Sequence, residues 1–390
     1  MKKMTSILFV LLLLVSGSAF AQVPPGFCGG LAEADCAILT ASSEAMTGLN
    51  SGTATMNIDL TVSNIPDAPF ESLAFNVAGD MVYHVDPALV EKYAAMQADP
   101  SALLKDMSQL GPMMEELFSG MDGQVSLKLT IPQDIVDLAA ESGSALPTEL
   151  STELRLVAGV GYINLSSLAE ALPEAGVPTG WYGLEIAKLM GSAMNMALAQ
   201  MEGQAMPSFD PSMFSQFTDP AFLESYIKVE RLADSDGAAV FQMSFDMAAL
   251  ATSPAFRDMM VKQMEMMGQE VDEAQIDQMI AMVAQMYEGL DMSITQSVDL
   301  STSYMTHMDM VFDWDLTALM SASGASSDVA APVINLVMSA DYADFNAAPE
   351  VTAPEDATVF TAEQIMQMMA GSMAGVADGL DVTPEATPGS

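Results

Sequence analysis

Residues 55–62, Thr-Met-Asn-Ile-Asp-Leu-Thr-Val, alternate polar and apolar side chains with a period of two. Because successive side chains of a β-strand point to opposite faces, this alternation predicts a strand with one dry and one wet face. Residues 73–85 follow a similar pattern, and the turn-forming stretch 66–69, Pro-Asp-Ala-Pro, lies between the two segments. The sequence therefore predicts an antiparallel meander whose apolar face packs against other elements and whose polar face meets water.

The same alternation recurs along the chain, between segments with helical spacing of apolar residues. Strands are predicted over 124–131, 150–165, 181–186, 226–232, 238–247, 292–300, 303–316 and 333–342. Helices are predicted over 31–46, 86–118, 166–172, 188–201 and 254–289, with breaks near Gly111-Pro112 and at Gly268. About nine or ten antiparallel strands with interposed helices indicate the α+β class, with a large curved antiparallel sheet and helices on one side.

The first 21 residues have the three zones of a secretory signal peptide. Lys2 and Lys3 give a basic start, an apolar run extends over 7–15, and small residues precede the cleavage point. The apolar run is about half the ~20 residues that cross a bilayer, and the absence of a cysteine at the cleavage point argues against lipid attachment. We therefore predict cleavage after Ala21 and an extracytoplasmic location, periplasmic or secreted.

The remaining chain is predicted to comprise one domain at 22–360 and a C-terminal part at 361–390. The domain contains all the predicted strands and the Met-rich helical insertions. The C-terminal part begins as a helix and ends in a tail that holds Pro384, Pro388 and Gly389. This composition predicts a disordered tail.

The chain is strongly acidic, with 52 Asp and Glu residues against 11 Lys and Arg residues. Two of the basic residues lie in the predicted signal peptide, so the mature chain keeps nine and has a formal net charge of −43. Such a field repels polyanions and argues against nucleic-acid binding. Although the mean hydropathy is +0.30, polar residues interrupt every later apolar stretch, so no transmembrane segment is predicted. We therefore expect the partner to be an apolar small molecule or lipid. A peripheral contact with a membrane or envelope component is also possible on this composition.

Cys28 and Cys36 are the only two cysteines. In an oxidising compartment a short disulfide is the favoured interpretation, with metal binding or two free thiols as alternatives. His84 and His307 are the only histidines, and neither has a recognisable nucleophile or a metal-ligand partner at helical spacing. Because no phosphate-binding, dinucleotide-binding or metalloprotease motif occurs either, we expect a non-enzymatic protein without cofactor or metal.

Methionine is unusually frequent, with 36 residues. One hypothesis is Cu(I) binding by thioethers. Its candidate ligands are Met259, Met260, Met264, Met266 and Met267. The favoured interpretation is an adaptable apolar lining or core, because methionine is flexible and polarisable and here recurs in strands and helices alike.

Four segments carry a family resemblance. They are a helix that runs into a strand, 41–51; a strand, short helix and Gly180-Trp181-Tyr182 strand; 232–237 followed by 240–247; and 340–346 followed by 351–357. In this order they resemble the extracytoplasmic half-barrel family that includes the lipoprotein carrier LolA and the LppX-like lipid-binding lipoproteins. The resemblance spans about residues 31–360 and implies a deeply curved sheet, or half-barrel, with helices covering its concave face around an apolar cavity. The chain departs from the smaller members because it lacks the lipobox cysteine and carries Met-rich helical insertions.

We therefore expect an exported protein that binds or carries an apolar ligand, a lipid or an acyl chain, between the curved sheet and the helices. Apolar residues of the alternating strands are the candidate ligand-lining residues. They are Met56, Ile58, Leu60, Phe75, Leu127, Leu129, Phe245, Met308, Met310 and Phe312. The alternative is an envelope structural or interaction protein with a filled core, and a Cu(I) binder is a third class.

Overall fold

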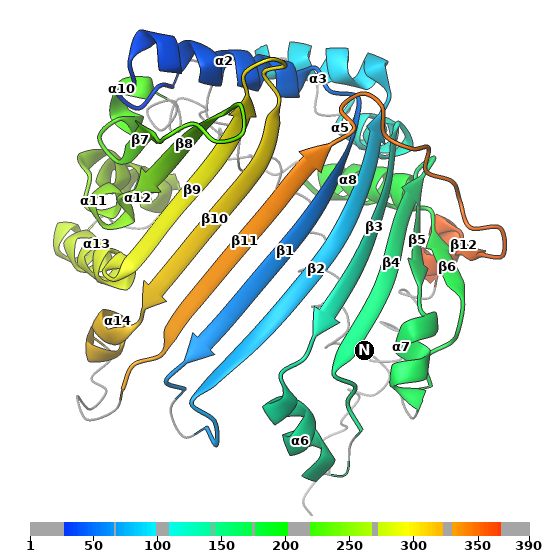
Figure 1. The fold of residues 1–390 in the computed structure, drawn as a ribbon. Helices are drawn as coiled ribbons and strands as arrows, with labels where there is room; N and C mark the ends of the chain where they lie inside the picture. Colours follow the sequence, from blue (N-terminus) through cyan, green and yellow to red (C-terminus); the bar gives the residue numbers. More distant parts are fainter. Residues whose placement is uncertain are drawn as a thin grey trace, which may run out of the picture.

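A computed structural model describes residues 27–65, 68–98, 109–141, 143, 145–173, 176–201, 219–266, 272–322 and 330–367. The predicted signal peptide at 1–21 and the predicted tail after residue 367 lie outside the described residues, and 362–367 are helical. The described part of the chain is α+β and contains one large, curved, open sheet of twelve strands (Figure 1).

The strands pair in the order β12-β6-β5-β4-β3-β2-β1-β11-β10-β9-β8-β7. Their bounds are β1 (Ser51–Ser63), β2 (Ser72–Val85), β3 (Met121–Thr130), β4 (Glu149–Val157), β5 (Val160–Asn164), β6 (Trp181–Leu184), β7 (Ile227–Arg231), β8 (Ala238–Phe245), β9 (Leu290–Asp299), β10 (Met305–Asp315), β11 (Val333–Ala343) and β12 (Thr358–Phe360). Two successive meanders, β1 to β6 and β7 to β11, therefore meet at the centre of the sheet, where β1 pairs antiparallel with β11.

The predicted strands are all present, but the sheet differs from the prediction in two places. Residues 150–165 form a hairpin, β4 and β5, because Ala158 and Gly159 adopt φ angles of 50° and 77°. Positive φ at both positions is typical of the tight turn that matches strand twist. The sheet is also mixed rather than purely antiparallel, because the three-residue strand β12 pairs parallel with β6. A strand of this length is too short for its alternation to be recognised.

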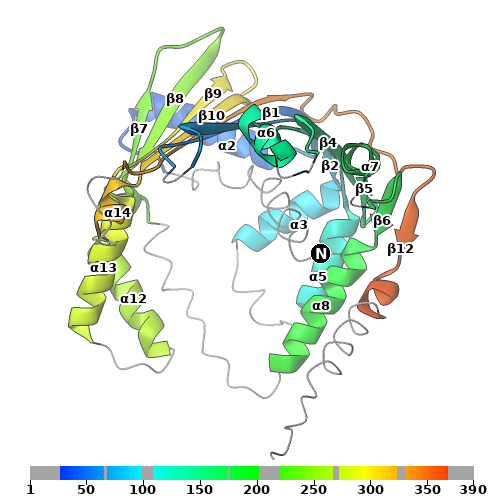
Figure 2. The ribbon, with the colours of Figure 1, turned by 90° about the horizontal axis from the view of Figure 1, so that it is seen from below.

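The helices lie between successive strands and are mostly short. Their bounds are α2 (Glu33–Thr47), α3 (Pro87–Ala98), α5 (Leu110–Ser119), α6 (Gln133–Glu141), α7 (Ser166–Ala171), α8 (Ile186–Met201), α10 (Pro220–Leu223), α11 (Met247–Ala251), α12 (Pro254–Met266), α13 (Glu273–Tyr287) and α14 (Thr317–Ala322). Figure 2 shows α3, α5 and α8 inside the bend of the sheet toward the β6 end, and α12 and α13 inside the bend toward the β7 end.

The two predicted helix breaks fall near helix ends of the structure. The predicted helix over 254–289 contains α12 and α13, and Gly268 lies in the stretch between them that is outside the described residues. The break predicted near Gly111-Pro112 agrees with the start of α5 at Leu110, so both residues lie in the first turn of this helix. Proline is tolerated in the first helical turn, where its missing N–H has no partner in the helix. A Cβ on Gly111 would lie 2.2 Å from Asn195 Oδ1 of α8, so this glycine permits the close packing of the two helices.

The best-packed part of the core lies under one end of the sheet, where α2 and the preceding segment cover strands β7 to β10. Phe241 and Val298 are fully buried there. The whole cluster comprises Phe27, Leu39, Val229, Ala239, Phe241, Met243, Ile294, Val298 and Met308. A disulfide joins Cys28 to Cys36, with a Cα–Cα distance of 5.2 Å. It holds the segment that precedes α2 against the first turn of that helix. The predicted disulfide is therefore present, and it fixes the element that covers this part of the sheet.

The segment 344–357 links β11 to β12 and passes the ends of the strands between them (Figure 1). Its carbonyl at Pro349 is 2.7 Å from His84 Nε2 of β2, and its carbonyl at Thr352 accepts a hydrogen bond of 2.8 Å from Arg155 of β4. Val351 is buried. These contacts hold the last part of the chain along one edge of the first meander and position β12 beside β6.

None of the helices in the described ranges is long and apolar enough to cross a membrane.

Candidate ligand-binding face

Nine apolar residues form one continuous row across nine neighbouring strands. The pairing register places Ile58 of β1 opposite Val77 of β2 on one side and opposite Met338 of β11 on the other. From β4 to β7 this central row consists of Leu150, Leu129, Val77, Ile58, Met338, Met310, Ile294, Met243 and Val229. At a strand spacing of about 4.8 Å, the central row extends for about 38 Å along the curve of the sheet. Its continuity shows that the alternation of each strand is in register with that of its neighbours.

All ten predicted ligand-lining residues lie on the face that contains the central row, which we call the apolar face. Trp314, on the same face of β10, donates a hydrogen bond of 2.9 Å from Nε1 to the Met286 carbonyl of α13. Since α13 lies inside the bend of the sheet (Figure 2), the apolar face is the concave one. The opposite, convex face is polar and is called the polar face below.

Burial changes along the apolar face. Met308 is a member of the packed cluster under β7 to β10, and Phe245 and Met310 pack against that cluster. Ile58, at the centre of the sheet, is also buried. The other six predicted lining residues are only half-buried, and they are Met56, Leu60, Phe75, Leu127, Leu129 and Phe312. The apolar face therefore has a packed end and, over the centre and the first meander, a part in which half-buried side chains outnumber buried ones such as Ile58 and Val125. We call this part the half-buried remainder.

The apolar face also carries a few polar groups, which the sequence prediction did not identify. Gln296 is buried between Phe241 and Met308 in the register. Tyr83 of β2 and Tyr342 of β11 lie on either side of β1. Burial raises the pKa of both phenols, and the nearby Tyr342 raises that of Tyr83 further. The period-two alternation places both tyrosines on this face, but it cannot show that their hydroxyls come near each other.

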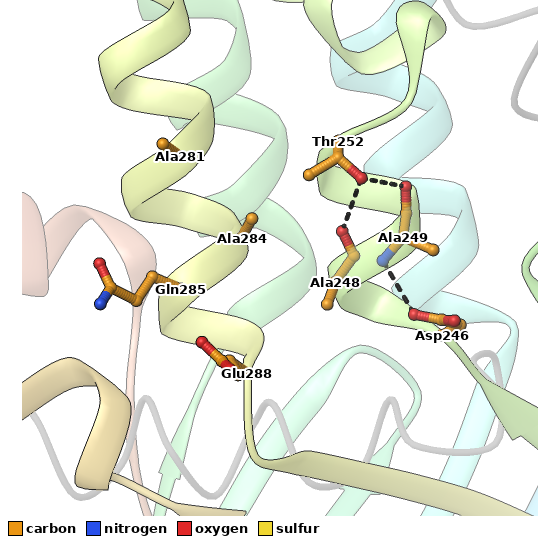
Figure 3. Close-up of a pocket in the computed structure, with 8 residues that line it drawn as sticks. All are labelled: Asp246, Ala248, Ala249, Thr252, Ala281, Ala284, Gln285 and Glu288. Carbon is orange, nitrogen blue, oxygen red and sulfur yellow. Dashed lines mark hydrogen bonds between the residues drawn. The ribbon is translucent and has the colours of Figure 1, made fainter.

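A separate pocket of about 550 Å³ lies between α11 and α13 (Figure 3). Half of its eight lining residues are alanines, including Ala281 and Ala284 of α13. Two of its polar side chains are already used by α11: the Asp246 carboxylate accepts from the Ala249 N–H, and the Thr252 hydroxyl donates to carbonyls of the same helix. A second pocket of about 290 Å³ adjoins it and includes Phe245. These pockets lie at the packed end and do not contain the half-buried remainder of the apolar face.

His307 forms a polar cluster on the opposite face of the sheet. Its Nδ1 is 2.7 Å from Asp341 Oδ1 on β11, and its Nε2 is 3.0 Å from Asp309 Oδ2 on β10. Burial lowers the pKa of His307, but the hydrogen bonds and charges of the two carboxylates raise it by more, so the pKa lies above its ordinary value. The protonated ring can donate to both carboxylates at once. The cluster therefore cross-links β10 to β11 most strongly when His307 is charged.

Replacing His307 by glutamine is expected to reduce stability more at low pH than at high pH. A raised folded-state pKa contributes stability that is fully present below the unfolded value of about 6.5 and is lost as the pH rises through the folded value. The cluster is partly exposed, so the effect should be below about 1 kcal/mol. Urea denaturation of both proteins from pH 5.5 to 8.5 measures the difference. Asp341→Asn should weaken the same pH dependence, and a constant difference across the range would refute this role.

The second histidine and the copper candidates lie in different parts of the structure. His84 lies at the end of β2 and contacts the Pro349 carbonyl. Of the copper candidates on α12, Met264 is buried and Met259 and Met260 are half-buried. Met267 lies outside the described residues, and so does the side chain of Met266. Within the described ranges, no three His, Cys, Asp or Glu side chains are grouped so that they could hold a metal ion.

Comparisons with known proteins add no assignment to this geometry. No protein-family model matches the chain, and no curated protein matches it.

Proposed function

We propose that this chain is an exported, non-enzymatic protein that holds an apolar ligand, such as a lipid or acyl chain, against the concave apolar face of its sheet. The observation that carries the proposal is the half-buried part of the apolar face, which is continuous with a packed core yet less covered. Large apolar surfaces that remain partly accessible are typical of binding sites. The proposed manner of binding follows the LolA and LppX-like carriers that the sequence resembles.

The physical basis is removal of apolar surface from water. Burial contributes about 25 cal/mol per Å², so a chain that loses about 250 Å² of contact with water gains about 6 kcal/mol. Flexible methionine side chains such as Met56 and Met338 can adapt to chains of different shape. Binding of this kind requires no catalytic group and little polar recognition.

The export part of the proposal rests on the signal-like sequence of 1–21 and agrees with the disulfide between Cys28 and Cys36. Disulfides persist in oxidising compartments. In such a compartment, a carrier would shield an acyl chain while it crosses an aqueous space.

The test uses the purified full-length mature protein. Organic extraction followed by lipid mass spectrometry should recover a bound lipid, and diphenylhexatriene, an apolar fluorophore without polar groups, should bind saturably with a Kd in the micromolar range. An empty extract together with no fluorescence increase would contradict the proposal. It would favour the alternative, a structural or interaction protein whose concave face is filled, as the packing around Met308 already is at one end.

A further inference from the structure

Two tyrosines flank the first part of β1 on the apolar face. Tyr83 of β2 is opposite Gly52, and Tyr342 of β11 is opposite Ala54. A Cβ on Gly52 would lie 2.8 Å from the Tyr83 hydroxyl oxygen and 2.8 Å from its Cε1 atom. The Tyr83 ring therefore lies over the backbone of β1 at Gly52, in the space that the missing side chain leaves. Tyr342 lies on the other side of β1, and its electrostatic effect on Tyr83 places the two phenols near each other.

Neither tyrosine hydroxyl makes a hydrogen bond within the described residues. Both side chains are half-buried, and neither hydroxyl is fully enclosed, because no fully buried polar side-chain atom in the described ranges lacks a partner. Tyrosine phenols are neutral near pH 7, and burial raises the pKa of both further, so each can donate one hydrogen bond. A partly buried donor without a partner loses solvation that a ligand can restore. The feature is thus a pair of donors at the margin of an apolar surface.

The pair is close enough to the central row to act on the same ligand. Tyr342 and Met338 lie four residues apart on β11, which corresponds to about 13 Å along the strand. A long acyl chain can span this distance while its apolar part lies on the row. One end of the ligand would then reach Tyr83 and Tyr342.

We propose that Tyr83 and Tyr342 bind the polar end of the ligand, and that this end is an uncharged hydrogen-bond acceptor such as the carbonyl of an acyl ester. This inference rests on the proposed binding of an apolar ligand and adds its chemical class.

The charges around the apolar face favour an ester over a free carboxylate. Among the described strands, Arg231 is the only basic residue on this face, and its guanidinium is bonded to Asp35 at 2.8 Å and to Asp234 at 2.6 Å. The nearest helices inside the bend carry Lys92 and Lys188, which are each paired with a glutamate. A carboxylate near Tyr83 would therefore be desolvated without an unpaired cation from the sheet or from these two lysines. The acidity of the whole chain adds to that cost.

The experiment compares three fluorescent probes on the full-length mature protein at pH 7.5. Methyl cis-parinarate carries an ester, cis-parinaric acid carries a carboxylate, and diphenylhexatriene has no polar group. We expect the ester to bind more tightly than the acid. In Tyr83→Phe/Tyr342→Phe, the Kd of the ester should rise at least about fivefold, as expected for two net hydrogen bonds, while that of diphenylhexatriene changes less than about twofold.

Tyr162→Phe is the matched control, because Tyr162 lies on the polar face opposite Arg155 and should leave all three affinities unchanged. The inference is overturned if the double variant binds the ester as tightly as the unmodified protein, or if the acid binds more tightly than the ester. Diphenylhexatriene distinguishes failure of this inference from failure of the proposed function. If diphenylhexatriene binds but the Kd of the ester is the same with and without the two tyrosine hydroxyls, only the inference fails. If diphenylhexatriene does not bind the unmodified protein, the proposed function fails as well.

Discussion

Phe241→Ala is expected to lower the free energy of unfolding by about 3–5 kcal/mol, the range for truncating a fully buried phenylalanine. Phe241 is fully buried, pairs with Gln296 of β9 and lies at the centre of the cluster under β7 to β10. The Arg231 guanidinium carbon lies 5.0 Å from the centroid of its ring, so the substitution also removes a cation–π contact. Urea denaturation followed by circular dichroism measures the loss.

Phe75→Ala is the matched control for this prediction. Phe75 lies on the same face, at β2, but it is only half-buried. Its truncation should cost about half as much stability or less, and it should weaken diphenylhexatriene binding. Equal losses of stability at the two positions would contradict the division of the apolar face into a packed end and a half-buried remainder.

Leu60→Asp is expected to weaken binding of diphenylhexatriene about a hundredfold, which corresponds to about 2.8 kcal/mol. Leu60 is a half-buried residue of β1 that lies between Phe75 and Leu336 in the register. A carboxylate at this position would be desolvated by the apolar ligand, and aspartate is too short to reach the solvent around it. Fluorescence titration measures the change, and circular dichroism confirms that the variant is folded.

The control substitution is Thr61→Asp, one residue further along β1 on the polar face, between Ala74 and Asn335. It adds the same charge to the same strand and should leave the affinity within about twofold of the original. If the two variants weaken binding equally, the ligand does not lie on the apolar face. Leu60→Ala, which adds no charge, gives a milder variant should the aspartate prevent folding.

Most strands could be predicted from the sequence because each alternates over several residues. The predicted strand at 55–62 lies within β1, and the predicted strand at 303–316 contains β10. In both strands the apolar side chains share one face, as the alternation predicts. The order of strands could not be predicted in this way, since alternation fixes the face of a side chain but not its neighbour. The pairing of β1 with β11, whose partner residues are 270 to 290 positions apart in the chain, depends on contacts that no local pattern records.

The face on which each candidate lining residue lies could be predicted for the same reason, but the burial of that residue could not. Met308 and Leu129 have the same local pattern, yet Met308 is in the packed cluster and Leu129 is half-buried. The difference arises because α2 and the segment that the disulfide links to it cover only one end of the sheet. This coverage depends on the tertiary arrangement and not on the local sequence. The proximity of Tyr83 and Tyr342 likewise follows from strand order, together with the small size of Gly52. The signal peptide and the family resemblance remain predictions.

The junction of β1 with β11 has a consequence for biosynthesis. The first meander is complete once residue 184 has been made, but β1 keeps an unpaired edge until β11, the last long strand, arrives. An exposed edge strand of this length, with alternating polar and apolar side chains, can pair with the wrong strand, including a strand of another copy of the same chain. Newly made chains should therefore depend on a chaperone until the final strand docks, and truncations that end before residue 333 should aggregate.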